Sequence, residues 1–368
     1  MSGLRGRVAA TARNLRRVAN RELRARAARR PPGDAWAFRL DAAATRVSRA
    51  LKRVERTALP PASMLDTAPA PRPARVVPVT QPLALISQTA RSGGTLLLRL
   101  LDDHPQCLVV PHELGSILGR SDVDPANAVE ALTPREAYDW ARRGVEIGKH
   151  ERDHVRPFGL SFPLMRELYA EASPHGDREV LDAYFTAYFN AWTDRARPPD
   201  DDARWVVGFE PNAIGNAARM RAFDDAYPDG RVVSVVRDPW SWFASARRWS
   251  MRFANLDVAM KHWSACTEGA LAFRARSPER IRVVTFDDLV LRTKATMRDI
   301  AAFLEIDVAP TLFQPTFNGM EVDDNSSFAG SAPGAVSAAP ALRGAELSAG
   351  EHTLVEERAG ALWQRVAA

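Results

Sequence analysis

Short apolar segments alternate with stretches of helical spacing along most of the chain. The segments with the length of buried strands are residues 83–86, 107–110, 205–209, 231–236 and 281–286. After the first, leucines at 96, 97, 100 and 101 form an apolar stripe on one helix face, and the last three are also followed by helical patterns. Strands that alternate with helices form a parallel sheet covered on both faces. The pattern predicts an α/β fold with three layers.

Residues 115–200 interrupt this alternation with helical patterns and no strands. The clearest helix is predicted over residues 177–195, where aromatic side chains recur at Tyr184, Phe185, Tyr188, Phe189 and Trp192. Aromatic side chains at this spacing suit a helix core or a surface that stacks on a sugar ring, and we favour the core.

The first 59 residues differ from the rest of the chain in charge. Residues 1–30 and 36–54 each have the spacing of an amphipathic helix, separated by Pro31-Pro32-Gly33. Residues 1–56 carry 16 arginines and lysines against four acidic residues, a net charge of +12. Since the whole chain carries +5, the remaining residues carry −7. Such helices suit an anionic membrane surface or an acidic partner, and equally a solvated face packed on the body.

A proline-rich segment separates this extension from the body. Seven prolines lie between residues 60 and 82, which predicts an extended linker over 60–81 and a globular domain over 82–368. No apolar run approaches the roughly 18 to 20 residues of a membrane span. The two cysteines, Cys107 and Cys266, are too few for a disulfide framework and fit a reducing compartment. We therefore expect a soluble, cytoplasmic protein.

Residues 83–103 combine a strand, a glycine turn and a helix. The turn contains Arg91-Ser92-Gly93-Gly94-Thr95. Glycines let a backbone approach a phosphate closely, and the first N–H groups of a helix point at it with the positive end of the dipole. Arg91 adds a full positive charge. The stretch predicts an anion cradle, although its glycines alone would suit an ordinary turn.

A second stretch, residues 231–249, has a similar arrangement. Arg237 follows the predicted strand, Asp238 suits a helix N-cap, and Pro239 suits the first helical position. Ser245 lies one turn beyond Ser241, where it can share an anion with Arg237. Parallel strands place both stretches at the same edge of the sheet, where open α/β sheets bind ligands. Two anion sites indicate a ligand with two phosphates.

The chain also contains one metal-site pattern. His150, Glu151 and His154 match H-E-x-x-H, in which two histidines bind zinc. Pro157 ends any helix within one turn, and no third ligand is evident, so we interpret the pattern as a solvated helix end and expect no metal.

The two anion-binding stretches resemble motifs of the sulfotransferase superfamily that uses 3′-phosphoadenosine 5′-phosphosulfate (PAPS). In that family a [KR]-S-G-[ST]-[ST] turn holds the 5′-phosphosulfate, as Arg91 to Thr95 would here. An arginine followed eight residues later by serine holds the 3′-phosphate, as Arg237 and Ser245 would here. Residues 284–289, 315–319 and 325–328 resemble later motifs, the last two a nucleotide-covering loop of bacterial members. The resemblance implies a P-loop-like fold.

The chemistry of sulfuryl transfer assigns roles to these residues. The departing phosphate gathers charge, which Arg91 and the amides of Gly93, Gly94 and Thr95 would stabilise in place of a metal, while Ser92 would contact the phosphate or tune Arg91. A base must take the proton of the acceptor hydroxyl. The resemblance to sugar-modifying members suggests Glu113 for that role, with His112 and Glu210 as alternatives. The sequence departs from the family at Gly94 and at Glu210, near which many relatives have lysine.

These observations lead to one favoured function and two alternatives. We expect a PAPS-dependent sulfotransferase that acts on a hydroxyl of a small-molecule or glycolipid acceptor, a carbohydrate or glycolipid, with residues 115–200 on the acceptor side. Residues 1–56 would attach it to an anionic membrane at the inner face, and no nucleic acid is expected. A P-loop kinase would need a lysine in the cradle, and no lysine lies there. A membrane-held adaptor without enzymatic activity is the third hypothesis.

Overall fold

A computed structural model describes residues 67, 69–115, 117–119, 123–146, 155–322 and 334–367. The predicted helices of residues 1–59 and the pattern at 150–154 lie outside the described residues. None of the helices in the described residues has both the length and the apolar character that a membrane span requires. The helices are α3 (Gly94–Leu101), α4 (Ala128–Leu132), α5 (Arg135–Arg143), α6 (Phe162–Ala172), α7 (Asp177–Ala191), α8 (Ala217–Ala226), α9 (Pro239–Trp249), α10 (Leu256–Arg276), α11 (Phe286–Leu291), α12 (Thr293–Leu304), α13 (Ala349–Val355) and α14 (Ala361–Ala367).

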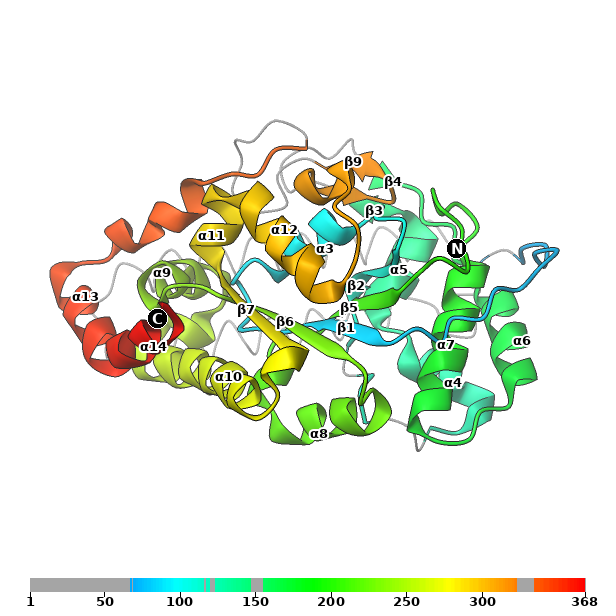
Figure 1. Ribbon diagram of the computed structural model, residues 1–368, viewed down its shortest axis with the longest axis horizontal. Coiled ribbons are helices and arrows are strands. Elements are labelled where there is room, and N and C mark those ends of the chain that lie inside the picture. Colours follow the sequence, from blue (N-terminus) through cyan, green and yellow to red (C-terminus); the bar gives the residue numbers. More distant parts are fainter. Residues whose placement is uncertain are drawn as a thin grey trace, which may run out of the picture.

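The central sheet has five parallel strands in the order β2-β5-β1-β6-β7 (Figure 1). They are β1 (Leu83–Ile86), β2 (Cys107–Glu113), β5 (Trp205–Phe209), β6 (Arg231–Val236) and β7 (Ile281–Thr285). Strand β1 pairs with β5 on one side and with β6 on the other, so the strand order reverses at β1. Such a reversal opens a crevice at the carboxyl end of β1. Short hairpins are formed by β3 (Val145–Glu146) with β4 (Val155–Arg156) and by β8 (Thr316–Phe317) with β9 (Met320–Glu321).

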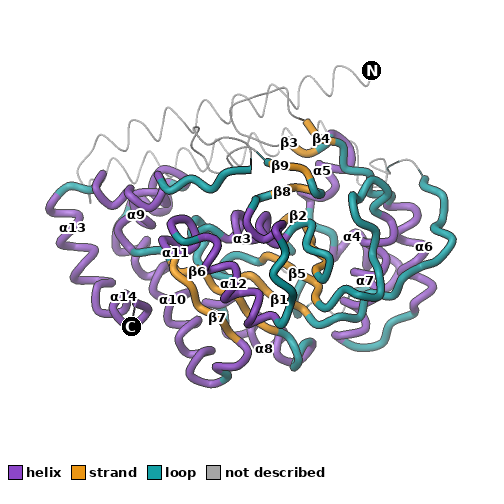
Figure 2. The backbone as a smooth tube through the Cα atoms, turned by 45° about the horizontal axis from the view of Figure 1, so that its top comes forward, coloured by secondary structure: helices purple, strands orange, loops and turns teal. Residues whose placement is uncertain are grey.

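Different helices cover the two faces of the sheet. Successive strand residues point to opposite faces, so Leu83 and Leu85 pack in one apolar cluster with α6, α7 and α8, whereas Ala84 and Ile86 pack in another with α3, α11 and α12. Figure 2 shows α13 and α14 at one end of the molecule and α6 and α7 at the other. The predicted three-layer α/β fold with a parallel sheet is confirmed.

Strand β2 continues beyond its predicted end. The sequence suggested an end at Val110, because Pro111 lacks the N–H that a central strand must donate. Strand β2 lies at the edge of the sheet, and its register with β5 shifts between Val109 and Glu113. Proline is tolerated at such a site, so the strand runs on and carries Glu113 to the crevice.

Helix α7 is a core element, as predicted. The rings of Tyr184, Phe185, Tyr188 and Phe189 are all fully or almost fully buried. The helix ends at Ala191, four residues before the predicted end, because Trp192 is extended and forms a bridge with Leu160. The aromatic residues of this helix are therefore unavailable for stacking on a ligand.

The described part of the proline-rich segment is attached to the domain. The N–H of Val77 donates to Asn190 Oδ1 at 3.0 Å, and that of Val79 donates to Thr186 Oγ1 at 2.8 Å. Arg72 also binds Glu171, with Nη2 and Oε2 2.7 Å apart. The segment thus lies extended along α6 and α7. The domain boundaries near residues 59 and 81 stay predictions.

Candidate active site

The glycine turn after β1 has the geometry of an anion cradle. Gly93 caps α3 with φ at +97°, a conformation that side chains rarely adopt, and Leu97 N–H donates to its carbonyl at 3.0 Å. A Cβ atom at Gly93 would lie 2.7 Å from the Phe286 ring. Ser92 is buried, and its hydroxyl has no hydrogen-bond partner among the described residues. A bound anion would supply that partner.

Gly94 is a glycine for a different reason. A Cβ atom there would lie 1.8 Å from Gln88 Nε2 and 2.6 Å from the Phe209 ring. The buried amide of Gln88 therefore fills the space into which the hydroxyl side chain of the family pattern would project. The cradle at this position can offer an anion only its backbone N–H.

Side chains from distant elements hold the backbone of the cradle. Ala90 donates its N–H to Asn212 Oδ1 at 3.0 Å and accepts from Trp242 Nε1 at 2.8 Å. Asn212 itself is left-handed, with φ at +66°, and donates its N–H to the Gln88 carbonyl at 2.8 Å. Sequence reasoning missed Asn212. The signal was present, since asparagine after proline and before Ala-Ile-Gly favours a turn with positive φ.

The second anion-binding stretch lies beside the cradle. Asp238 caps α9 by accepting from Ser241 N–H at 2.8 Å, as predicted. Arg237 is 3% exposed. Its guanidinium lies over the Phe286 ring, 4.5 Å from the ring centre, and its Nη1 donates to the Arg91 carbonyl at 3.4 Å. Ser245, on the next turn of α9, is buried with no partner for its hydroxyl in the part of the chain described.

A third arginine joins this group. Burial, together with the charges of Arg343 and Arg91, lowers the pKa of Arg237 to about 10 against the opposing effects of Asp238 and Asp287. Arg237 is still protonated at neutral pH, so its charge and those of Arg91 and Arg343 lie close enough to affect one another. Arg343 comes from a 3-10 helix over Ala339–Glu346 that packs on α9. The sequence Leu342-Arg343-Gly344 matches no recognisable motif, so sequence reasoning missed Arg343.

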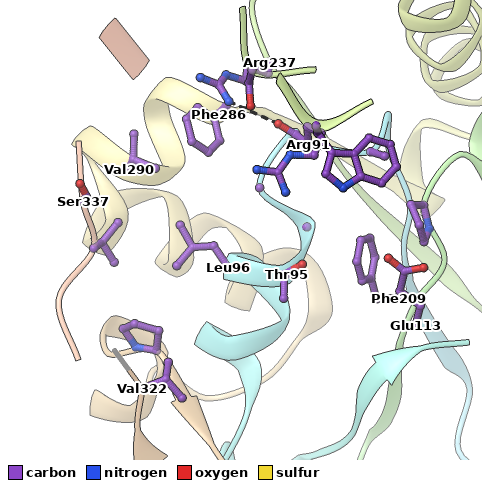
Figure 3. Close-up of a pocket in the computed structure, with 18 of the residues that line it drawn as sticks. Arg91, Thr95, Leu96, Glu113, Phe209, Arg237, Phe286, Val290, Val322 and Ser337 are labelled. Atoms are coloured by element: carbon purple, nitrogen blue, oxygen red, sulfur yellow. Dashed lines mark hydrogen bonds between the residues drawn. The ribbon is translucent and has the colours of Figure 1, made fainter. Parts of the chain in front are cut away.

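One cavity connects the cradle, Arg237 and Ser245 with Glu113 (Figure 3). Figure 3 shows Arg91 and Thr95 in its middle, Leu96, Val290, Val322 and Ser337 on one side, and Glu113 and Phe209 on the other. Among the described residues, the lining consists of Ala90, Arg91, Gly93, Gly94, Thr95, Leu96, Glu113, Phe209, Pro211, Arg237, Ser245, Trp249, Phe286, Val290, Pro315, Val322, Ala335, Val336 and Ser337. The cavity thus has a cationic centre, an apolar end and an acidic end.

Glu113 is the carboxylate at the acidic end. It lies beside Phe209 at the carboxyl ends of β2 and β5 and is exposed to the cavity. Surrounding protein removes part of its hydration, which raises its pKa above the usual range of a glutamate. A carboxylate with a raised pKa is a better proton acceptor than an ordinary one.

The two alternative bases do not line the cavity. His112 is 3% exposed, and both of its ring nitrogens are within hydrogen-bond distance of protein groups. Glu210 is 2% exposed, with Oε1 2.8 Å from Arg219 Nη1. Glu113 is therefore the one of the three predicted bases that can meet a ligand in this cavity. No group of three or more potential metal ligands gathers in the part of the chain that the structure describes.

The chain matches one protein-family model and is similar to several solved structures. A family model described as "Sulfotransferase family" matches residues 82–310. A search of curated proteins found no match. Among solved structures, the sulfotransferase domain of the Synechococcus PCC 7002 olefin synthase is 18% identical with a TM-score of 0.48, and the match covers 79% of this chain and 98% of that one. The sulfotransferase domain from the curacin biosynthetic pathway is 16% identical with a TM-score of 0.45, covering 77% and 99%.

The match to the family model spans well over half of the chain. It includes both anion-binding stretches and all five strands of the sheet, among them β2, which carries Glu113. The chain belongs to the sulfotransferase family.

Proposed function

We propose that this protein transfers the sulfuryl group of PAPS to a hydroxyl of a carbohydrate or glycolipid acceptor. The observation that carries the proposal is the single cavity that contains an anion cradle, a separate arginine and serine pair, and one carboxylate. A donor with two phosphates fits the first two features, and an acceptor that must lose a proton fits the third.

The donor would lie along the cationic centre and the apolar end. The cradle from Arg91 to Thr95 would hold the 5′-phosphosulfate, and Arg237, Ser245 and Arg343 would hold the 3′-phosphate. The buried hydroxyls of Ser92 and Ser245 support this arrangement, since burial without a partner costs about 1 to 3 kcal/mol for each group. Leu96, Phe286 and Val290 line an apolar end suited to the adenine base.

The residues of the cavity would then divide the reaction between them. The acceptor oxygen forms a bond to sulfur while the bond from sulfur to the 5′-phosphate oxygen breaks. Glu113 accepts the proton of the hydroxyl, and Arg91 with the cradle amides stabilises the charge left on the phosphate. Arg91 supplies the positive charge that a metal supplies in kinases, so the scheme uses no metal.

The acceptor end favours a sugar. Phe209 and Pro211 line the cavity at the end that holds Glu113, and Trp249, with 46% of its surface exposed, lines the same cavity. A cavity with an exposed indole and a carboxylate suits a ring with an apolar face and hydroxyls at its edge. Residues 115–200 follow Glu113 directly along the chain, which supports their predicted place on the acceptor side.

Nucleotide affinity tests the donor assignment. We expect 3′-phosphoadenosine 5′-phosphate to bind without magnesium in calorimetry, and Arg237→Ala to weaken binding about 10- to 100-fold, as expected for loss of a hydrogen bond to a charged group. Arg248→Ala is the matched control, because Arg248 lies on α9, the helix that begins just after Arg237, but outside the cavity, where it binds Glu346 at 2.8 Å. A preference for ATP with magnesium, or equal effects of the two variants, would contradict the proposal.

We further propose that residues 1–56 hold the enzyme on an anionic membrane at the cytoplasmic face. Their net charge of +12 supports this, since each basic residue near such a surface contributes about 1 kcal/mol. We expect the full chain to sediment with vesicles of anionic lipid and not with neutral ones, and a variant without residues 1–56 to stay in solution while it keeps its turnover on a soluble acceptor. Sedimentation of the shortened variant to the same extent would refute the idea.

A further inference from the structure

The imidazole of His112 lies between the backbone of Glu113 and a tyrosine of α7. His112 Nδ1 is 2.9 Å from the Glu113 carbonyl oxygen, and Nε2 is 3.0 Å from the Tyr188 hydroxyl. A carbonyl oxygen can only accept, so Nδ1 carries the proton. Nε2 then has a lone pair and accepts from the Tyr188 hydroxyl. The three groups form a directed chain from Tyr188 through His112 to the backbone of Glu113.

The surroundings keep this chain neutral. Tyr188 and His112 are 0% and 3% exposed, and burial together with the charge of Arg99 lowers the pKa of His112 to about 4. The groups that face it are Arg99 from α3, the Trp140 ring of α5 at 5.9 Å and the Tyr188 ring at 5.6 Å. Glu136 accepts a hydrogen bond from the N–H of Glu113. Both backbone polar groups of Glu113 are thus bound.

We propose that Tyr188 and His112 are positioning residues that fix the backbone of Glu113, and with it the direction of its carboxylate toward the acceptor. The inference rests on the proposed role of Glu113 as the base. Burial makes the arrangement stiff, because α7 belongs to the apolar core and Tyr188 cannot move without disturbing it.

Tyr188 matters because it selects the tautomer. With its hydroxyl donating to Nε2, the proton of the neutral imidazole must be on Nδ1, where it binds the Glu113 carbonyl. Without that hydroxyl the proton is free to move to Nε2, and the carbonyl loses its donor. The carboxylate would then be held less firmly. Small displacements of a reacting group cost up to about 100-fold in rate.

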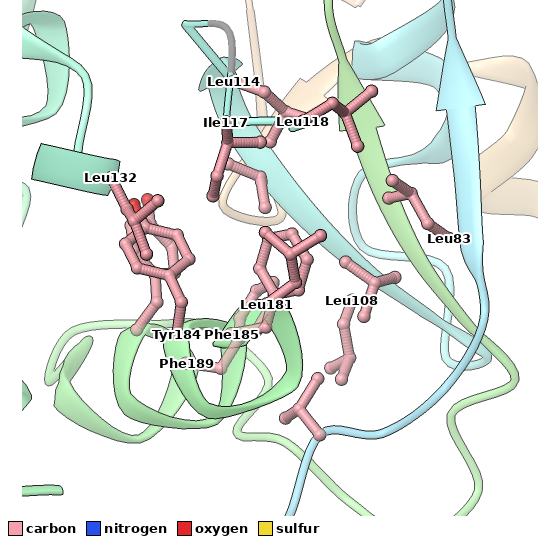
Figure 4. Close-up of a cluster of buried hydrophobic side chains, with 14 of the residues drawn as sticks. Leu83, Leu108, Leu114, Ile117, Leu118, Leu132, Leu181, Tyr184, Phe185 and Phe189 are labelled. Atoms are coloured by element: carbon pink, nitrogen blue, oxygen red, sulfur yellow. The ribbon is translucent and has the colours of Figure 1, made fainter. Parts of the chain in front are cut away.

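The first experiment compares two tyrosine variants. Tyr188→Phe should lower kcat about tenfold or more and leave the affinity for 3′-phosphoadenosine 5′-phosphate unchanged. Tyr184→Phe is the matched control, since its ring is also buried on α7, one turn earlier, and lies in the apolar cluster shown in Figure 4. Both variants lose one buried hydroxyl, so their melting temperatures should fall by similar amounts. Equal effects of the two variants on kcat would overturn the inference.

The second experiment separates the two bonds of His112. An asparagine amide can stand where Nδ1 stands and donate to the Glu113 carbonyl, whereas a glutamine amide reaches the position of Nε2. We expect His112→Asn to keep most of the kcat and His112→Gln to lose about tenfold or more. This pair keeps the inference testable if Tyr188→Phe fails to fold. A glutamine variant as active as the asparagine variant would overturn it.

Nitrogen NMR of the imidazole gives a readout that does not depend on activity. The wild-type protein should show His112 neutral at pH 7 with its proton on Nδ1, and Tyr188→Phe should shift the proton toward Nε2. A wild-type proton on Nε2 would refute the inference. Failure of the proposed function gives a different result from failure of this inference. The wild-type enzyme would then show no PAPS-dependent transfer even with the predicted tautomer in place.

Discussion

Glu113→Gln should lower kcat by about 10²- to 10⁴-fold, the range that a positioned general base contributes. Glutamine keeps the size and shape of the side chain but cannot accept the hydroxyl proton. We expect the affinity for 3′-phosphoadenosine 5′-phosphate to be unchanged, because Glu113 lies at the end of the cavity away from Arg237 and Ser245. Steady-state transfer from labelled PAPS together with calorimetry measures both quantities.

The pH dependence of turnover tests the same assignment. Only the ionised form of Glu113 can take a proton, and desolvation raises its pKa above that of an ordinary glutamate. The kcat of the wild-type enzyme should therefore fall on the acid side at a higher pH than about 4.3, the unperturbed value. Glu113→Gln should lose this acid limb. Normal turnover in the variant would eliminate Glu113 as the base.

Apolar patterning was sufficient to predict the sheet. Strands β1, β5 and β6 have the predicted bounds, because each is a short apolar run buried on both faces, and such runs leave little choice of register. The aromatic residues of α7 were predicted to be core for a similar reason. Alternation of strands and helices then determined the fold class.

Long-range contacts explain most of what the pattern missed. Arg343 acts on Arg237 only because η7 (Ala339–Glu346) packs on α9, and no local pattern encodes that packing. The glycine at position 94 looked like a departure from the family motif. Its cause is the amide of Gln88, six residues earlier, which occupies the side-chain space.

The rival bases show how sequence position can mislead. His112 and Glu113 are neighbours at a strand end, so only the family resemblance ranked Glu113 ahead of His112. Alternation along the strand sends their side chains in opposite directions, His112 into the core beside Tyr188 and Glu113 toward the cavity. A one-residue change in register would have exchanged their roles.

Two replacements of Arg91 should lower activity equally but differ in their effect on stability. Removing its guanidinium should lower kcat by about 10²- to 10³-fold, as loss of one preorganised group that stabilises transition-state charge does. Arg91 lines the cavity at the cradle, where the 5′-phosphate leaving group of the proposed reaction would gather charge. Both Arg91→Ala and Arg91→Gly should show this loss in transfer from PAPS.

The backbone of Arg91 makes the two variants differ in stability. Its φ is +75°, which costs an L side chain about 1 to 2 kcal/mol and costs glycine almost nothing. Arg91→Gly should therefore be more stable than Arg91→Ala by about 1 kcal/mol in denaturant unfolding, after allowance for the larger entropy of unfolded glycine. An alanine variant at least as stable as the glycine variant would show that the strain is absent. If instead both variants turned over like the wild type, Arg91 would not stabilise the leaving group, and the conformation of residue 91 would serve only the shape of the turn.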